Sequence, residues 1–186
     1  MIYFPRLTIV LDANVIYPAP IRDLLLNLAD LDIFSPKWSE LIQDEWTRNL
    51  LKNRPDLSKA KLLRTVNMMN AAFPDAEVYG FEELIDELEL PDSNDRHVLA
   101  VGIACKADAI ITFNKKDFPN RYLDQFNIEV YDPDELLALL NSLNPSIVRK
   151  AFENQLDSLK NPPMTKVELI EVLLNCNLKT AMKIFG

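Results

Sequence analysis

Acidic and amide side chains follow two strongly apolar stretches of the sequence. Asp12 comes directly after Leu7–Leu11, and Asn114 and Asp117 come just after Ala109–Phe113. Both stretches are typical of buried parallel strands, and ligands of open α/β sheets bind beyond the carboxyl ends of such strands. Taken alone, each of these polar residues would also fit a helix cap or a turn, where Asp and Asn are common.

Two further acids stand in predicted helices. Glu45 lies within an apolar helical stripe that runs through Trp38, Leu41, Ile42, Trp46 and Leu50, so it faces the core and needs a partner. Either a buried salt bridge to an arginine or a bound cation would meet that need. Asp95 falls in the first turn of a helix whose N-cap is Asp92 or Ser93. There it would either interact with the helix dipole or project over the sheet edge towards Asp12.

Four acids together predict a metal-dependent site, and they are Asp12, Glu45, Asp95 and Asp117. Carboxylates that converge at one sheet edge repel one another unless cations are present. Oxygen-only ligands suit Mg²⁺ or Mn²⁺. Such ions can activate water and stabilise the charge that develops on a phosphate during hydrolysis.

The composition excludes several other kinds of site. One histidine and two cysteines cannot build a zinc site that needs two histidines, nor a Cys₄ or Cys₃His site. The sequence has only three glycines, none in a phosphate-cradling loop of the Walker or dinucleotide kind. The net charge of −8 argues against a nonspecific nucleic-acid coat protein, although metal ions can mediate contact with phosphate.

Alternating strand and helix patterns predict an α/β domain with a mainly parallel sheet. The expected strands are Leu7–Leu11, Asp32–Ser35, Glu77–Tyr79, Ala109–Phe113 and Ile128–Tyr131. The expected helices are Ile21–Leu31, Trp38–Leu51, Ser58–Ala72, Phe81–Leu88, Asn94–Lys106 and Pro133–Leu143.

The chain divides into a main domain, residues 1–143, and a helical C-terminal extension, residues 144–186. A capping box from Thr165 to Glu168 opens one helix of the extension, and a turn near Cys176–Asn177 leads to another. Their apolar faces are too large to stay in water, so we expect the extension to pack on the main domain or on a second subunit.

Sequence features favour a cytoplasmic location. No apolar run approaches the ~20 residues that span a bilayer. The first residues lack a basic leader, so a signal peptide is not expected. Cys105 and Cys176 fall in helical stretches and suggest core thiols in a reducing compartment.

The order of motifs resembles that of PIN-domain nucleases. The matching stretches are "LDANV", the glutamate of the second predicted helix, "DRHVLAVGIA" and "TFNKKDF". The stretches "PAPIRDLLLNLA", "DEWTRNLL", "DRHVLA" and "KNPPM" are similar to those of VapC-type toxin ribonucleases with a helical C-terminal extension.

The resemblance implies a three-layer α/β/α fold and a Mg²⁺- or Mn²⁺-dependent endoribonuclease, in which Asp12, Glu45, Asp95 and Asp117 hold one or two metals. It makes Asn14 and Asn114 supporting residues, and Asp92 is an extra acid near these motifs that is a candidate outer-sphere ligand. It implies hydrolysis of an RNA phosphodiester to a 5′-phosphate and a 3′-hydroxyl. It also implies a protein antitoxin as partner and leaves a homodimer open.

Basic residues beside these motifs are candidates for phosphate contacts, namely Arg96, Lys115 and Lys116. The run 52–64 adds five basic residues against one acid, although a solvated charged face is the more common reason for such a run.

Other functions stay open at this stage. A PIN domain that processes RNA without being a toxin would carry the same acids, and a catalytically silent PIN scaffold would bind without cutting. A haloacid-dehalogenase-like phosphatase would need a second acid at the position of Asn14, and a receiver domain offers no place for Glu45.

Overall fold

A four-stranded parallel sheet forms the centre of the protein in the computed structural model, which describes residues 6–186. Its strands are β1 (Leu7–Leu11), β2 (Phe34–Lys37), β3 (Ala109–Ile111) and β4 (Glu129–Tyr131), in the order β2-β1-β3-β4. The central strands β1 and β3 pair directly, with Leu11 opposite Ile111. The predicted parallel sheet is therefore confirmed, and its two central strands end side by side.

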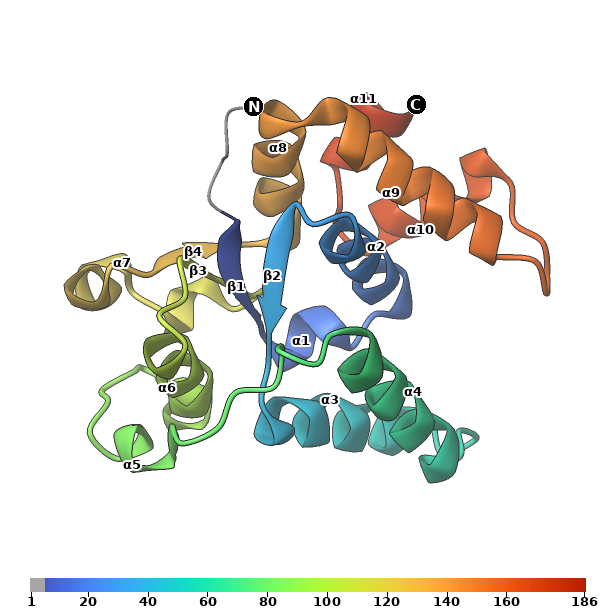
Figure 1. Ribbon diagram of the computed structural model, residues 1–186. Coiled ribbons are helices and arrows are strands. Elements are labelled where there is room, and N and C mark those ends of the chain that lie inside the picture. The colour runs from blue at the N-terminus through green and yellow to red at the C-terminus, as the bar shows by residue number, and fades with distance from the viewer. Residues whose placement is uncertain (1–5) are drawn as a thin grey trace.

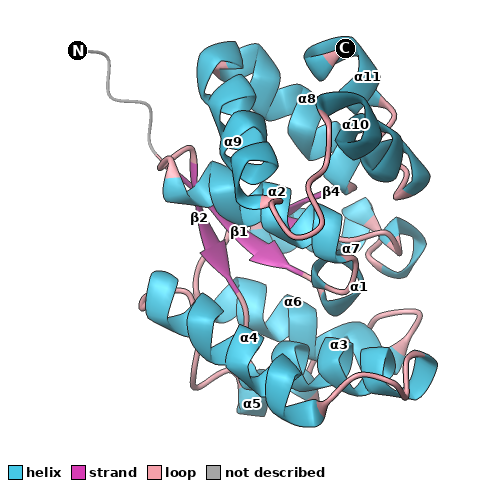
Figure 2. Cartoon of the chain, turned by 90° about the vertical axis from the view of Figure 1, so that its right-hand side faces the viewer, coloured by secondary structure: helices cyan, strands magenta, loops and turns pink. Residues whose placement is uncertain are grey.

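Helices cover both faces of this sheet, which confirms the three-layer α/β/α fold. Figure 2 shows the sheet between α2 and α8–α11 on one side and α3–α6 on the other. The helices are α1 (Ala13–Ile16), α2 (Ala19–Asp30), α3 (Glu40–Asn53), α4 (Lys59–Ala72), α5 (Glu82–Ile85), α6 (Arg96–Ala104), α7 (Asn120–Leu123), α8 (Pro133–Leu143), α9 (Pro145–Ser158), α10 (Lys166–Asn175) and α11 (Thr180–Phe185). The short helices α1 and α7 were not expected, because one helical turn carries no periodic pattern.

Four of the expected strands differ from the structure. The strand expected over Ala109–Phe113 ends at Ile111, and the one expected over Ile128–Tyr131 begins at Glu129. The second strand begins two residues late, at Phe34, because Asp32 takes a left-handed conformation that belongs to a turn. β2 contains Pro36, which an edge strand tolerates. The expected strand Glu77–Tyr79 is wrong: Glu77 forms only an isolated bridge with Trp38, and Gly80 turns the chain away with a φ of +73°.

Burial of the central strands fits their apolar sequence. Ile9, Val10, Leu11, Ile110 and Ile111 are completely or almost completely buried. The part of a strand that is buried on both faces is apolar, which explains why polar residues resume only where β1 and β3 end, at Asp12 and Thr112.

The C-terminal extension packs on the main domain, which is one of the two arrangements expected from the sequence. Helix α9 lies along α2, and α10 and α11 lie against α2, α8 and α9 (Figure 1). Phe152 of α9 stacks on Phe185 of α11 with 4.2 Å between ring centroids. Gln155 Nε2 donates a hydrogen bond of 2.9 Å to the carbonyl oxygen of Pro20. The expected capping box of Thr165 and Glu168 is present.

The division of the chain at Leu143 stays a prediction. Asn144 both ends α8 and caps α9, so the two helices follow each other without a linker. Within residues 6–186, no helix is long and apolar enough to cross a membrane.

The stacked pair of aromatic rings yields a stability prediction. Phe152→Ala should lower the free energy of unfolding by about 3–5 kcal/mol, because it opens a cavity between α9 and α11. Met182→Ala on α11 is the matched control: its side chain is 51% exposed, so the change should cost less than about 0.5 kcal/mol. Urea denaturation followed by circular dichroism measures both values, and equal effects would contradict the packing described here.

Candidate active site

Asp12 is a buried carboxylate at the carboxyl end of β1. Only 2% of the residue is exposed. Its Oδ2 accepts a hydrogen bond of 2.7 Å from Thr112 Oγ1 and one of 2.6 Å from Asn14 Nδ2. Its backbone N–H donates to Ile111 of β3, which ties the ends of the two central strands together. The carboxyl group is therefore held in one orientation by its neighbours.

Thr112 is the residue of this network that the sequence analysis missed. The fully buried Oγ1 accepts hydrogen bonds from Asn14 Nδ2 at 3.1 Å and from the backbone N–H of Asn114 at 3.0 Å, while donating to Asp12. Asn14 Oδ1 accepts from the backbone N–H of Phe113 at 3.0 Å. The lone polar residue in "AIITF" was a signal for Thr112, because it is the residue that follows β3 opposite Asp12.

Asp95 occupies a turn that Asp92 caps. Asp92 Oδ1 accepts hydrogen bonds of 2.9 Å from both the backbone N–H and the Nδ2 of Asn94, and a 3₁₀ turn over Ser93–Asp95 then leads into α6. Asp95 is 9% exposed. Its Oδ2 is buried and has no hydrogen-bond partner in the part of the chain that the structure describes. A buried carboxylate oxygen without a donor is one that a cation could satisfy.

Glu45 contacts His97 rather than an arginine. The distance from Glu45 Oε2 to His97 Nε2 is 3.1 Å, so α3 and α6 meet at this pair. Glu45 is partly exposed rather than fully core-facing, and Leu41 of the predicted apolar stripe is wrong as a core residue, being 44% exposed. Gln43 is buried instead and accepts a hydrogen bond from Trp46 Nε1. No sequence pattern marks His97 as part of the site.

Burial and mutual repulsion raise the pKa of two of these acids. The pKa of Asp12 rises to about 6, chiefly because burial removes water, while the hydrogen bond from Thr112 opposes the shift and the charge of Glu45 adds to it. The pKa of Asp95 rises to about 7, again chiefly through burial, and then through the charges of Asp12, Asp92, Asp117 and Glu45. Burial is therefore a larger cause of both shifts than the mutual repulsion of the acids.

The four predicted acids thus lie within electrostatic reach of one another at one end of the sheet. They are not in contact as ligands would be: among residues 6–186, no three His, Cys, Asp or Glu side chains are arranged to hold one ion. Asp117 stands on the 3₁₀ turn Lys115–Asp117 that follows β3. The role of these acids as metal ligands stays a prediction.

The other predicted site residues are placed as follows. Asn114 and Lys116 are exposed on the segment after β3, and Arg96 is half-buried at the start of α6. The ammonium group of Lys115 lies 2.6 Å from Glu135 and 3.7 Å from Asp132. Lys115 is therefore engaged with two carboxylates, which weakens the case for it as a phosphate contact.

Comparison with known proteins places the chain in a family. The family model "PIN domain" matches residues 8–116, more than half of the chain, so the chain belongs to the PIN-domain family. The model "VapC50 C-terminal domain" matches residues 133–184, which include α8 and the extension. The chain is 30% identical over 98 residues to "Putative ribonuclease VapC50" of Mycobacterium tuberculosis. That match covers 53% of this chain and 57% of the relative, and no solved structure matches.

The raised pKa values predict how pH affects the metal-free protein. A carboxyl whose pKa is higher folded than unfolded destabilises the fold once it ionises, so the penalty grows from about pH 4 to about pH 7. Asp95→Asn should therefore raise the free energy of unfolding at about pH 8 by on the order of 1–3 kcal/mol and change it little at about pH 4. Urea denaturation in EDTA at both pH values measures this, and a gain that did not depend on pH would show that Asp95 ionises normally.

Proposed function

We propose that this PIN-domain protein is a Mg²⁺- or Mn²⁺-dependent endoribonuclease that hydrolyses RNA phosphodiester bonds and acts as the toxin of a toxin–antitoxin pair. The observation that carries the proposal is the buried Asp95 carboxylate, whose Oδ2 has no protein donor among residues 6–186 while four other acids act on its pKa. The similarity to a protein named as a putative ribonuclease supports the choice of RNA.

The donor set fits a hard divalent cation. We infer that Asp12, Glu45, Asp95 and Asp117 would hold one or two ions, with Asp92 in an outer position, because all of their donors are oxygens. Binding would require these carboxylates to close up from their present positions. When bound, such an ion would lower the pKa of a water molecule and stabilise negative charge on the phosphate.

The chain's own residues would orient the acids for this chemistry. Asn14 and Thr112 hold Oδ2 of Asp12, so that carboxylate cannot rotate freely. His97 holds Glu45 in the same way from α6. Hydrolysis by water breaks the bond between phosphorus and the 3′ oxygen, so the products would carry a 5′-phosphate and a 3′-hydroxyl.

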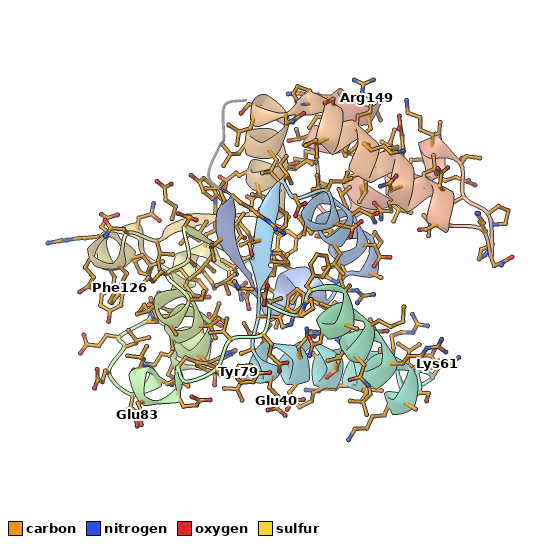
Figure 3. The ribbon with its side chains drawn as sticks, viewed as in Figure 1. Glu40, Lys61, Tyr79, Glu83, Phe126 and Arg149 are labelled. Carbon is orange, nitrogen blue, oxygen red and sulfur yellow. The ribbon has the colours of Figure 1, made fainter. Side chains whose placement is uncertain are left out.

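Positive charges near the site would attract the RNA backbone. Arg96 and Lys116 stay our candidates beside the acids. The predicted basic run 52–64 joins the end of α3 to α4, and its five basic side chains are exposed. Figure 3 shows Lys61 at the outer end of this helical hairpin, pointing away from the sheet.

Cleavage by variants tests the proposal. Asp12→Asn and Asp95→Asn should each lower the rate of RNA hydrolysis in Mn²⁺ by roughly a hundredfold or more, because each removes a charge that holds the cation. Asp44→Asn, an exposed neighbour of Glu45 on α3, should cut at the wild-type rate. The measurement is release of 5′-phosphorylated fragments from a structured RNA. A catalytically silent scaffold would release none with any of the four proteins, and undiminished cleavage by Asp12→Asn would refute the site.

Expression in a bacterial host separates a toxin from a housekeeping nuclease. Wild-type protein should arrest growth at least tenfold more strongly than Asp12→Asn, since cleavage of an essential RNA is what harms the cell. An antitoxin that places an arginine against the acids would relieve the arrest. Colony counts after induction measure the effect. Normal growth with abundant, cleavage-competent protein would favour an RNA-processing role instead.

A further inference from the structure

A polar cavity opens directly beside the acids, between α1 and α3. Its volume is about 320 Å³, and its lining residues are Ala13, Asn14, Tyr17, Glu45, Asn49, Lys52 and Asn53. Asn14 and Glu45 belong also to the candidate active site, so the two sites are continuous. Figure 1 shows α1 at the end of the sheet with α3 packed beside it.

One face of α3 supplies most of this cavity. Four lining residues lie on the same side of this helix, because they follow one another at spacings of four, three and one: Glu45, Asn49, Lys52 and Asn53. The side chains of Asn49, Lys52 and Asn53 are exposed and none of them serves the core. This face therefore presents a carboxylate of the acidic site, two amide groups and an ammonium group.

Tyr17 forms the opposite wall of the cavity. Its ring is half-buried and packs against the hydrophobic core, so the ring is held in place. Its hydroxyl oxygen accepts a hydrogen bond of 3.1 Å from Asn53 Nδ2, across the cavity. A fixed aromatic ring facing amide side chains is the combination that single-stranded RNA-binding sites use to stack a base and hydrogen-bond its edge.

From this arrangement the geometry points to a binding subsite for one nucleotide of single-stranded RNA, adjacent to the phosphate that is cut. The base lies against the Tyr17 ring, the amides of Asn49 and Asn53 contact its edge, and Lys52 contacts a neighbouring phosphate. The volume is at the lower end of the roughly 300–1,000 Å³ range of ligand pockets, which suits a single nucleotide. This assignment rests on the proposed ribonuclease function and adds the residues that select the sequence.

A larger polar cavity elsewhere is a poorer fit for RNA. Its volume is about 690 Å³, and it lies beside β4 with three acids in its lining, Asp124, Glu129 and Glu135. The lysine that also lines it, Lys115, is paired with Glu135. A phosphodiester there would meet acids and an ammonium group that is already neutralised.

Sequencing of cleavage products tests the subsite. Wild-type protein with Mn²⁺ cuts a pool of random-sequence 12-nucleotide RNAs, and the nucleotides beside the cut are counted. Asn49→Ala should reduce the base preference at one of these positions by roughly tenfold, and Tyr17→Leu should slow cleavage by roughly tenfold. Asn67→Ala, an exposed asparagine in the middle of α4, is the matched control and should keep both rate and preference.

Photocrosslinking tests binding without cleavage. A 12-nucleotide RNA that carries 5-iodouridine at each position in turn is irradiated with the Asp12→Asn protein in Ca²⁺. Mass spectrometry should then find the crosslink on Tyr17, and Tyr17→Leu in the same background should lose it.

The two measurements separate failure of the subsite from failure of the proposed function. One contrary outcome is that the wild-type protein cuts while Asn49→Ala and Tyr17→Leu keep its rate and base preference, and another is that crosslinks form only on other surfaces. Either result would overturn the subsite and leave the nuclease assignment standing. Crosslinks on Tyr17 of the Asp12→Asn protein, together with no cleavage by the wild-type protein, would support the subsite and overturn the nuclease. Neither cleavage nor crosslinking would overturn both.

Discussion

The burial of the Asp12 carboxyl group is the constraint on which the site depends. A charge at the end of a fully covered central strand loses its water, which is why the pKa of Asp12 rises to about 6. Hydrogen bonds from Thr112 and Asn14 offset part of that cost and fix the direction of the carboxylate. The same network connects β1 to the segment after β3, so the geometry of the site is fixed by the pairing of the two central strands.

The remaining acids reach this point from separate helices. Glu45 comes from α3 and Asp95 from the turn before α6, and His97 joins α3 to α6 through Glu45. The neighbouring acids add to the cost of ionising Asp12 and Asp95, so the metal-free site holds unfavourable electrostatic energy. A divalent cation would relieve that repulsion. Binding of the ion would therefore stabilise the folded protein.

The extension and the acidic site lie at different places on the fold. α9–α11 bury their apolar faces against α2 and α8, whereas the acids and the neighbouring cavity are formed by α1, α3, α6 and the ends of β1 and β3. The extension therefore completes the core on one side of the sheet without covering the proposed RNA path. This separation explains how a PIN domain could keep an open site while carrying extra helices.

The sequence by itself determined the parallel sheet, most helices, and the acids at the strand and helix ends, because apolar runs and helical periodicity are local signals. It could not show that Glu77 forms a single bridge, that Leu41 is exposed, or that His97 rather than an arginine meets Glu45. Thr112 and Tyr17 gained their roles only from segments brought together by folding, with Thr112 a hundred residues from Asp12. Hydrogen bonds and desolvation depend on which side chains lie close together in the folded chain. Local sequence patterns do not reveal those long-range contacts.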